Sequence, residues 1–306
     1  LAAGRIGKIG GIMKYPYSIV YAFGDRPGRG NPAGVVTDAR GLNEADMQAI
    51  ARLNNLSETA FLFPQEDPGT PYRVRFFTPM HPIPMCGHAS IASAFLYWRE
   101  KGQPERIAFS QATDVGPLRL EVGQAPGSPQ IWLEMDRPLL TDSLDGERER
   151  LAEALRIPPE EIAEGLPVIV NERAYLFLPI RSLKTVQSMR PDFTRMSSLD
   201  QELGLHGWYV FSRETLDPSR QVHGRFFAPY FGVPEDPVTG TANGYLASYW
   251  HRYLNGLPED SFRVEQGFEI GCDGLLEVRY RAKSGELQEV WVGGGASLYL
   301  EGVLHW

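Results

Sequence analysis

An internal repeat is the feature of this sequence that most restricts its possible folds. The segment RFFTP at 75–79 returns as RFFAP at 225–229, and GHAS at 87–90 returns as GTAN at 240–243. In the same order, the segment from Gln111 to LEV at 120–122 returns from Gln266 to LEV at 276–278, and IWL at 131–133 returns as VWV at 290–292. A period near 150 residues is too long for a solenoid. Since 306 residues suffice for two domains, we expect two similar domains in one chain.

Each half of the repeat is rich in strand-like segments and contains one long apolar helix. The helix follows the Gly-x-Ala turn in both halves and ends in Tyr-Trp, at 97–98 and at 249–250. The chain has 32 glycines and 24 prolines, which favours many strands and tight turns. We therefore predict an α+β fold in which each half is a curled mixed sheet around a central helix. The two helix N-termini are expected to face each other across a cleft between the domains.

The expected domain limits follow from the repeat. We predict an N-terminal domain at 14–140 completed by 295–306, because the last segment has strand character and is expected to cross back. The C-terminal domain is expected at 141–294, after a boundary rich in proline and charge. Residues 1–13 contain no apolar stretch of signal-peptide length, and we interpret them as an extension or a vector-derived remnant.

Charge and cysteine content restrict the partners and the compartment. The 30 basic and 38 acidic residues give a net charge of −8, which argues against nucleic acid or an anionic membrane as main partner. No apolar run reaches membrane-spanning length. Two cysteines, Cys86 and Cys272, do not make a disulfide scaffold, so a reducing, cytoplasmic location is expected.

The segment MCGHAS at 85–90 places a thiol, a glycine and an imidazole at a helix start, where unpaired backbone amides bind anions. His88 either orients or protonates a substrate there, or bonds to a backbone carbonyl. Cys86 is either a thiolate activated by the helix N-terminus or a small buried apolar residue. Glu58 lies between a helix and the apolar strand TAFLF. If it is partly buried, a raised pKa would suit proton transfer; otherwise it is a strand-end glutamate in solvent.

Asp236 and Thr241 mark the corresponding helix start in the second half. They either cap the helix or bind a ligand, with the Thr241 hydroxyl holding a carboxylate and Asp236 a polar group. The repeat favours ligand binding, because Thr241 lies at the position equivalent to His88. We predict no metal, because His81, Cys86 and His88 have no second ligand cluster at zinc spacing. The glycines at 293–295 do not form a nucleotide-binding motif, and no cofactor is expected.

Together these motifs resemble the phenazine-biosynthesis PhzF-like family of the diaminopimelate epimerase-like superfamily. The matching segments run in family order across nearly the whole chain: GNPA at 30–33, NLSETAF at 55–61, RFFTP at 75–79, CGHA at 86–89, EDPVTGTA at 235–242 and QG at 266–267. The resemblance implies a two-domain fold with the active site between the domains. It also implies cofactor-independent isomerisation by proton transfer, and it points to a homodimer.

The resemblance also implies roles for single residues. Glu58 matches the acid/base glutamate, His88 the histidine of the Gly-His motif, and Asp236 the aspartate of the Asp-Pro-x-Thr-Gly motif. Thr241 stands where the family usually has serine. With Gly87 and Gly240, Thr241 is expected to bind the substrate. Many relatives carry a glutamate where this chain has Pro82, so the family's best-known substrate, a dihydro-hydroxyanthranilate, does not transfer to this chain directly.

We therefore expect a cofactor-independent isomerase that moves a proton on a small carboxylated ring or amino-acid-like substrate, with Glu58 as acid/base. One alternative is a racemase or epimerase that uses Cys86. A two-cysteine racemase is disfavoured, because the position of its second cysteine falls in Pro237-Val238. A second alternative is a small-molecule binding protein without catalysis.

Overall fold

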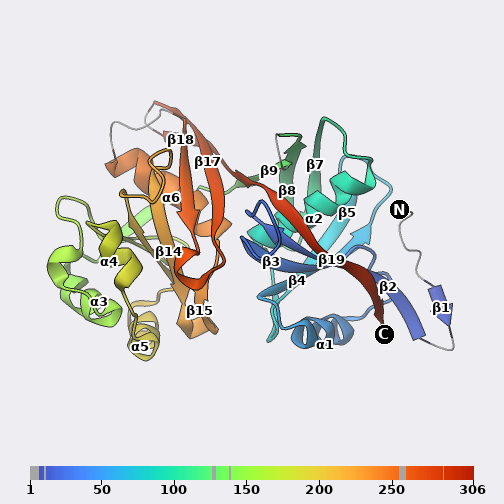
Figure 1. Cartoon of the computed structure of the whole chain (residues 1–306), viewed down its shortest axis with the longest axis horizontal. Helices are drawn as coiled ribbons and strands as arrows, with labels where there is room; N and C mark the ends of the chain where they lie inside the picture. The colour runs from blue at the N-terminus through green and yellow to red at the C-terminus, as the bar shows by residue number, and fades with distance from the viewer. Residues whose placement is uncertain (1–6, 10–11, 126–128, 138, 255–259, 285) are drawn as a thin grey trace. The chain divides into compact units, whose positions relative to one another are not determined.

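The computed structural model describes residues 7–9, 12–125, 129–137, 139–254, 260–284 and 286–306 (Figure 1). Its backbone divides into two compact units. Unit 1 contains the chain up to Glu134 together with Gly293–Trp306, and unit 2 is Met135–Val292. The interpretation of residues 1–13 falls largely outside the described residues. Of that segment, β1 (Gly7–Ile9) pairs with the beginning of β2.

Unit 1 is a mixed sheet. Its strands pair in the order β19 (Ala296–His305), β2 (Ile12–Ala22), β3 (Asn31–Val36), β4 (Glu58–Pro64), β5 (Tyr72–Phe77), β7 (Arg106–Thr113), β8 (Gly116–Gly123) and β9 (Gln130–Met135). The short β6 (Pro82–Ile83) pairs with β5. The pairs β3–β4 and β5–β7 are parallel and the others antiparallel. The last strand of the chain, β19, lies along β2 (Figure 1).

Unit 2 repeats this pattern of pairings. Its strands pair in the order β10 (Leu140–Ser143), β11 (Ile169–Asn171), β12 (Tyr175–Pro179), β13 (Gly207–Ser212), β14 (Val222–Ala228), β16 (Ser261–Gln266) and β17 (Gly274–Lys283). Strand β15 (Val233–Asp236) pairs with β14, and β18 (Glu286–Gly294) follows β17. Again two pairs are parallel, β12–β13 and β14–β16. The predicted α+β fold with two similar domains is confirmed.

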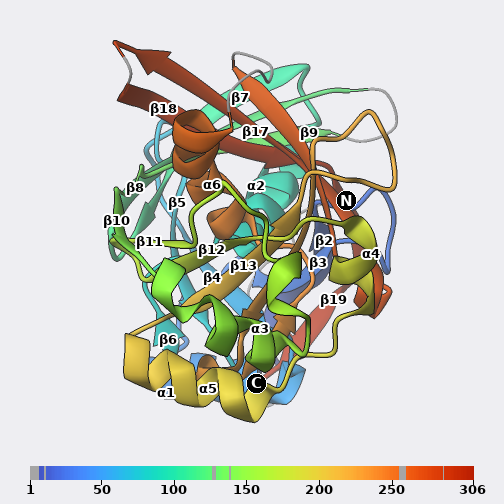
Figure 2. The same ribbon diagram turned by 90° about the vertical axis from the view of Figure 1, so that its left-hand side faces the viewer.

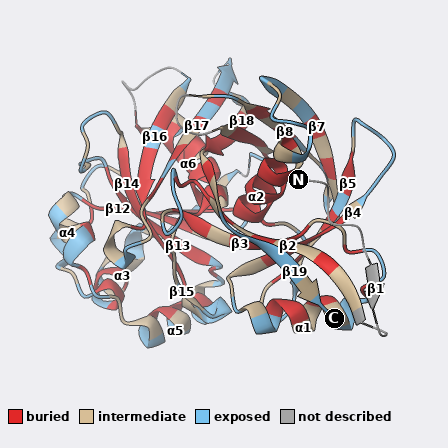
Figure 3. Ribbon diagram, turned by 45° about the vertical axis from the view of Figure 1, so that its right-hand side comes forward, coloured by how far each residue is buried: buried red, intermediate tan, exposed pale blue. Residues whose placement is uncertain are grey.

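A buried helix runs against the sheet in each unit. In α2 (Gly87–Glu100) every residue is buried except Tyr97, Arg99 and Glu100, as Figure 3 shows. Strands β2, β3, β4, β8 and β19 all contact this helix, so the sheet of unit 1 curls around it. In unit 2, α6 (Gly240–Tyr253) contacts β12 and β17. A helix that is apolar on all sides must be enclosed, which is why the sheet bends.

Helix α1 (Glu44–Asn54) begins with a capping box. The Asp46 amide donates to Asn43 Oδ1 at 2.9 Å, and the Asn43 amide donates to Asp46 Oδ2 at 3.1 Å. This reciprocal capping box fixes the start of the helix. Met47, Ile50 and Ala51 form its buried face.

Unit 2 contains three helices that the sequence analysis does not predict: α3 (Arg148–Leu155), α4 (Leu183–Ser188) and α5 (Phe193–Leu203). Helices α3 and α5 pack side by side (Figures 1 and 2). They bury Leu151, Leu155, Met196 and Leu199 in one apolar cluster, which also contains Trp208. The short 3₁₀ helices are η1 (Asp145–Glu147), η2 (Pro159–Glu161), η3 (Pro229–Phe231) and η4 (Phe268–Ile270).

Both cysteines carry free thiols, and Cys86 is buried. Within the described part of the chain, every helix is too short or too polar to traverse a lipid bilayer.

Candidate active site

Three of the singled-out side chains meet in unit 1, at the first residue of β4 and the N-terminus of α2. Glu58 begins β4, whose parallel pairing places it beside Ala33 of β3. Cys86 is the N-cap of α2 in extended conformation, and His88 lies in the first helical turn. One ligand-type atom of each of Glu58, Cys86 and His88 lies within 4.8 Å of the other two. The structure thus brings together residues that lie 30 positions apart.

Glu58 and His88 form a close pair. His88 Nε2 lies 3.2 Å from Glu58 Oε2, and the two side chains are 7% and 15% exposed. Ser57 Oγ lies 3.5 Å from the same ring nitrogen. Glu58 Oε2 is buried and makes no hydrogen bond of good geometry among the described residues, and His88 is its ion-pair partner. Glu58 is therefore not a solvent-exposed strand-end residue.

The pair holds its proton on the imidazole. Burial opposes the ionised form of Glu58, but the charge of His88 together with hydrogen bonding from His88, Ser57 and Cys86 outweighs it and lowers the pKa of the carboxyl. Burial also opposes a charged His88, but Cys86 and Glu58 together raise the pKa of the imidazole well above its usual value. The expected raised pKa of Glu58 is thus wrong, although burial by itself acts in that direction. The main opposing cause is the imidazole, whose contact with Glu58 exists only in the folded chain.

Cys86 lies on the other side of the imidazole, with Sγ 3.5 Å from His88 Nδ1. Burial and the charge of Glu58 raise the pKa of its thiol. The helix N-terminus therefore does not produce a thiolate, and of the two readings the structure favours the small buried residue. His81, which the sequence places near this group, is exposed, and its Nδ1 lies 3.2 Å from the Pro82 carbonyl oxygen.

The corresponding residues of unit 2 lie at the end of β15 and the start of α6. Asp236 ends β15, Thr239 is the N-cap of α6, and Gly240 and Thr241 are its first residues. The Thr239 hydroxyl donates to Asp236 Oδ2 at 2.5 Å instead of capping the helix. Among the described residues, the partly exposed Thr241 hydroxyl has no hydrogen-bond partner. Neither α2 nor α6 has a side-chain cap, so the first-turn amides at Gly87 and Gly240 are not used by an N-cap side chain.

Gln266, a residue to which the sequence analysis gives no role, holds this loop in place. Its amide nitrogen donates to the Asp236 carbonyl oxygen and to Thr239 Oγ1, both at 3.1 Å. Its amide oxygen accepts from Asn243 Nδ2 at 2.9 Å and from the Thr239 amide at 3.3 Å. Because Gln266 donates to the Thr239 hydroxyl, the proton of that hydroxyl is directed to Asp236.

The same arrangement recurs in unit 1. Gln111 donates to Ser90 Oγ at 2.6 Å, and Ser90 Oγ donates to the Cys86 carbonyl oxygen at 2.7 Å. In unit 2, Asn243 takes the place of Ser90 and donates to the Thr239 carbonyl oxygen at 2.9 Å. The repeat already pairs the two glutamines, and that pairing is the signal that could have identified them.

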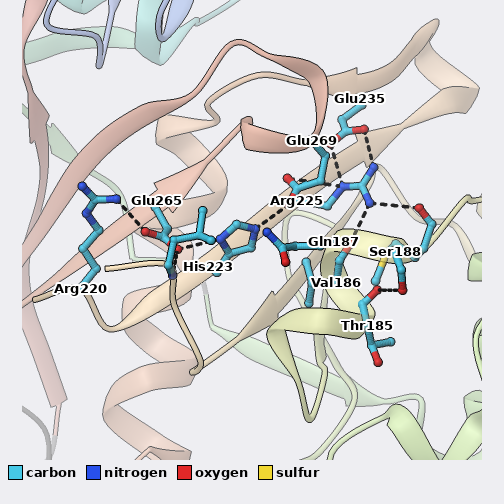
Figure 4. A network of polar contacts seen from close by, with 12 residues as sticks. Thr185, Val186, Gln187, Ser188, Arg220, His223, Arg225, Glu235, Glu265 and Glu269 are labelled. Carbon is cyan, nitrogen blue, oxygen red and sulfur yellow. Dashed lines mark hydrogen bonds and ion pairs between the residues drawn. The ribbon is translucent and has the colours of Figure 1, made fainter. Parts of the chain in front are cut away.

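A buried chain of charges lies next to this loop in unit 2 (Figure 4). His223 contacts Glu265 Oε1 through Nδ1 and Glu269 Oε1 through Nε2, both at 2.8 Å. Arg220 binds Glu265 at 2.7 Å, and Arg225 binds both oxygens of Glu235 at 2.8 Å. The three carboxylates are balanced only if His223 is protonated along with the two arginines.

Unit 1 has an exposed counterpart of this chain. Asp114 lies 2.7 Å from Arg73 and 4.0 Å from Arg75, as Glu269 lies 2.8 Å from His223 and 4.0 Å from Arg225. Hydrogen bonds to Glu265 and Glu269 outweigh burial and raise the pKa of His223. His223 therefore acts as the buried equivalent of an arginine. Glu235 and Glu265 are the direct neighbours of Asp236 and Gln266 in sequence.

Comparison with known proteins agrees with this fold and these motifs. Residues 20–302 match the family PhzC-PhzF, described as "Phenazine biosynthesis-like protein". A protein of Clostridium acetobutylicum, named an uncharacterized isomerase, is 35% identical over 93% of this chain and 96% of its own. The crystal structure of a Bacillus anthracis phenazine biosynthesis protein of the PhzF family superposes with a TM-score of 0.85 at 29% identity, over 95% of this chain and 99% of that one.

A more distant neighbour defines the fold class. A hydroxyproline epimerase of Agrobacterium vitis superposes with a TM-score of 0.58 over 95% of this chain and 92% of its own, at 12% identity, which shows the fold alone. The protein is thus an isomerase-type enzyme with the diaminopimelate epimerase-like fold. Within that class, the chain belongs to the phenazine biosynthesis-like PhzC-PhzF family.

Proposed function

We propose that this enzyme is a cofactor-independent isomerase that moves a proton on a small carboxylated substrate, with Glu58 as the acid/base. The observation that carries the proposal is the state of the Glu58 carboxylate. It is buried, it is kept ionised by His88 at 3.2 Å, and its Oε2 is not engaged in a directed hydrogen bond. Such an oxygen has a lone pair available for a proton from carbon.

The proposed reaction conserves atoms and charge. Glu58 removes a proton from one carbon of the substrate, and the resulting carboxylic acid returns it to another carbon. His88, as imidazolium, stabilises the Glu58 carboxylate before transfer and lies close enough to donate to negative charge that develops on the substrate. A well-placed acid/base contributes about 100- to 10,000-fold to the rate.

Substrate binding is proposed for the two helix starts. Gly87 and Gly240 offer first-turn amides that no side chain caps, and Thr241 offers a hydroxyl without a partner among the described residues. Amides at a helix N-terminus suit a carboxylate. Asp236 is proposed to bind a polar group of the substrate, with its carboxylate held by the Thr239 hydroxyl.

The test is proton exchange in deuterated water. A panel of small ring and amino-acid-like carboxylates is incubated with the wild-type enzyme, and deuterium incorporation at carbon is followed by NMR. Glu58→Gln keeps the size of the side chain but removes the base, and we expect the exchange rate to fall at least about 100-fold. Glu66→Gln, at an exposed glutamate, is the matched control. Full exchange in Glu58→Gln would exclude Glu58 as the base.

The position of Cys86 motivates the second candidate, a racemase or epimerase that uses this thiol, since Sγ lies 3.5 Å from His88. Ligand-prevented inactivation by a thiol reagent would support it. Unchanged exchange in Cys86→Ala would remove it. The homodimer implied by the family resemblance stays a prediction, and light scattering of the purified protein checks it.

A further inference from the structure

We propose that Gln266 and Asn243 are positioning residues for substrate binding in unit 2. They fix the direction of the Thr239 hydroxyl, and this hydroxyl in turn holds the carboxylate of Asp236. The direction of these hydrogen bonds follows from the geometry. Their effect on the substrate rests on the proposed function, in which Asp236 binds a polar group.

The side-chain amide of Asn243 has only one orientation that satisfies its neighbours. One of its two terminal atoms lies 2.9 Å from the Thr239 carbonyl oxygen, which can only accept, so this atom is the nitrogen. The other atom is the oxygen, and it accepts a hydrogen bond from the hydroxyl of the buried Tyr209. A backbone carbonyl therefore sets the first step of the chain of hydrogen bonds.

The amide of Gln266 is oriented in the same way. Its Oε1 faces two donors, Asn243 Nδ2 at 2.9 Å and the Thr239 amide at 3.3 Å, and its Nε2 faces the Asp236 carbonyl oxygen at 3.1 Å. The reverse orientation would set donors against donors and acceptor against acceptor. Nε2 therefore also donates to Thr239 Oγ1, at 3.1 Å. The proton of that hydroxyl is left for Asp236 Oδ2, at 2.5 Å.

The chain connects a rigid interior to a partly exposed carboxylate. Asn243 and Gln266 are fully buried, and Thr239 is 9% exposed. The backbone of Gln266 pairs on both sides, with β14 and with β17. A buried amide that lost its partners would be costly, so the chain is stable only as a whole. Asp236, by contrast, ends a strand of four residues and is partly exposed.

Unit 1 shows that this glutamine can join strand and helix without an N-cap hydroxyl. Gln111 is as buried as Gln266, and it donates to Ser90 Oγ at 2.6 Å. The position equivalent to Thr239 is Cys86, whose thiol lies 3.5 Å from His88 Nδ1. The bond from the glutamine to an N-cap hydroxyl therefore belongs to the unit in which that hydroxyl holds a carboxylate.

Gln266→Glu tests the direction of the chain, because it keeps the acceptor for Asn243 and replaces the donor. A protonated carboxyl can still donate to Thr239, whereas an ionised one accepts its proton and draws it away from Asp236. We expect KM for a carboxylate that wild type deuterates to rise about 10-fold at high pH and to approach wild type at low pH. The kcat should stay within about 2-fold, because the lost interaction serves binding.

The comparison with wild type at each pH removes the titration of groups that both proteins share. These are Asp236 within the chain and Glu265, the neighbour of Gln266, which is paired with His223 and Arg220. Gln201→Glu, at an exposed glutamine, is the control for the added charge and should show no such change.

Thr239→Val removes the hydroxyl and should raise KM as much as Gln266→Glu does at high pH, while Thr239→Ser restores it and should remain close to wild type. The double variant of Gln266→Glu and Thr239→Val should have no higher KM than Thr239→Val alone, because Gln266 acts through the hydroxyl. Circular dichroism verifies the fold of each variant.

Unchanged KM in Thr239→Val, or a KM increase in Gln266→Glu that is equal at all pH values, would overturn the positioning role. If wild type deuterates no carboxylate, the proposed function fails, and the effect on substrate binding fails with it. Urea unfolding then still decides the direction of the chain. The midpoint of Gln266→Glu should fall relative to wild type as pH rises, and a constant difference would contradict the assigned direction.

Discussion

At the scale of the residue, the groups around Glu58, His88 above all, reverse the effect of burial on its pKa. A carboxyl with so little exposure would ordinarily have a raised pKa, but the imidazole of His88 at 3.2 Å lowers it. The same contact, together with Cys86, raises the pKa of the imidazole. The carboxylate is thus ready to accept a proton without first losing one.

Thr241 tests the proposed binding role of the second helix start. Thr241→Val keeps the shape of the side chain and removes its unpartnered hydroxyl. We expect KM for a carboxylate substrate to rise about 10-fold, since one hydrogen bond to a charged group is lost. Thr241→Ser, which restores the hydroxyl, should remain close to wild type. Equal KM values for all three proteins would show that the hydroxyl does not bind substrate.

The sequence identifies which residues form the site better than it predicts their protonation. Glu58 and His88 stand out because motifs surround them, and the structure places them in contact. The direction of the Glu58 pKa shift is not predictable, because it depends on a contact between residues of different elements. Gln266 is missed as a positioning residue, because a strand-end glutamine has no local signature of its partners and only its pairing with Gln111 in the repeat marks it.

At the scale of the element, neighbouring side chains of β16 lie in two different environments, one on each face of the strand. Successive side chains of a strand point to opposite faces. Gln266 holds the loop that carries Asp236, while its neighbour Glu265 belongs to the buried charge chain with His223. Strand β15 is similar, since Glu235 binds Arg225 and the next residue is Asp236. On both strands a residue of the buried charge chain is the direct neighbour of a residue at the proposed site. The stability of the charge chain and the position of the site residues are therefore linked.

The His223 network predicts a pH dependence of stability. The pKa of His223 is raised in the folded state, so its contribution is complete below the unfolded value near 6.5 and is lost as pH rises through the folded value. The pKa of Glu265 is lowered, so its contribution is present above about 4.5 and is lost as pH falls through its folded value.

Urea unfolding of His223→Gln as a function of pH measures this contribution. We expect a loss of about 3 kcal/mol near pH 6, because two buried carboxylates lose their common cation. The difference from wild type should shrink as pH rises. His206→Gln, at an exposed histidine, is the control and should follow the wild-type profile. A constant difference at all pH values would show that His223 is not protonated in the folded protein.

Replacing Gly267 tests how closely other backbone atoms approach the turn after β16. Its φ of +86° disfavours any other residue, and an added Cβ would lie 2.6 Å from the Pro237 carbonyl oxygen. Gly271, at the other end of η4, has φ +71° but open space around the same position. Both alanine variants bear the left-handed strain of about 1–2 kcal/mol. Gly267→Ala should therefore lower the melting temperature further than Gly271→Ala, and equal losses would contradict the close contact.

Some of the helices and strands can be predicted from the sequence, and others cannot. The capping box of α1 and the apolar strands of unit 1 follow from local patterns. Helices α3 and α4 are harder to predict, because they are short and packing supplies most of their stability. Helix α5 is as long as α1, and Asp192 and Gly204 cap its two ends, so its local signals are present in the sequence and are missed.

At the scale of the whole molecule, the sequence repeat appears as a repeated order of strand pairings. Parallel pairs fall at the same two places in each unit, β3–β4 and β5–β7 in one and β12–β13 and β14–β16 in the other. Such an order could be expected from the repeat, because similar segments at similar spacing form similar sheets. The additional helices of unit 2 could not, because the repeat has no counterpart for them.

Because the C-terminal strand β19 belongs to unit 1, truncating the C-terminus is expected to destabilise unit 1. Strand β19 pairs with β2 from Ala296 to His305 and contacts α2. Removing residues 296–306 exposes an edge of the sheet and one side of its central helix. We expect amide hydrogen exchange in β2 to rise sharply, while strands β12 and β13 of unit 2 keep their protection. Removing only residues 304–306 should leave most of β2 protected, and unchanged protection of β2 in the longer truncation would contradict this role of β19.

The most direct test of the central claim measures exchange and binding on the same samples. Wild type and Glu58→Gln are each mixed with a carboxylate that wild type deuterates, and both deuterium incorporation and ligand-induced thermal stabilisation are recorded. We predict that Glu58→Gln keeps the stabilisation and loses the exchange by at least about 100-fold. Exchange that persists in Glu58→Gln would contradict Glu58 as the acid/base. If the wild-type protein deuterates no carboxylate of the panel and is nevertheless stabilised by one, it binds without catalysis, which would also contradict the claim.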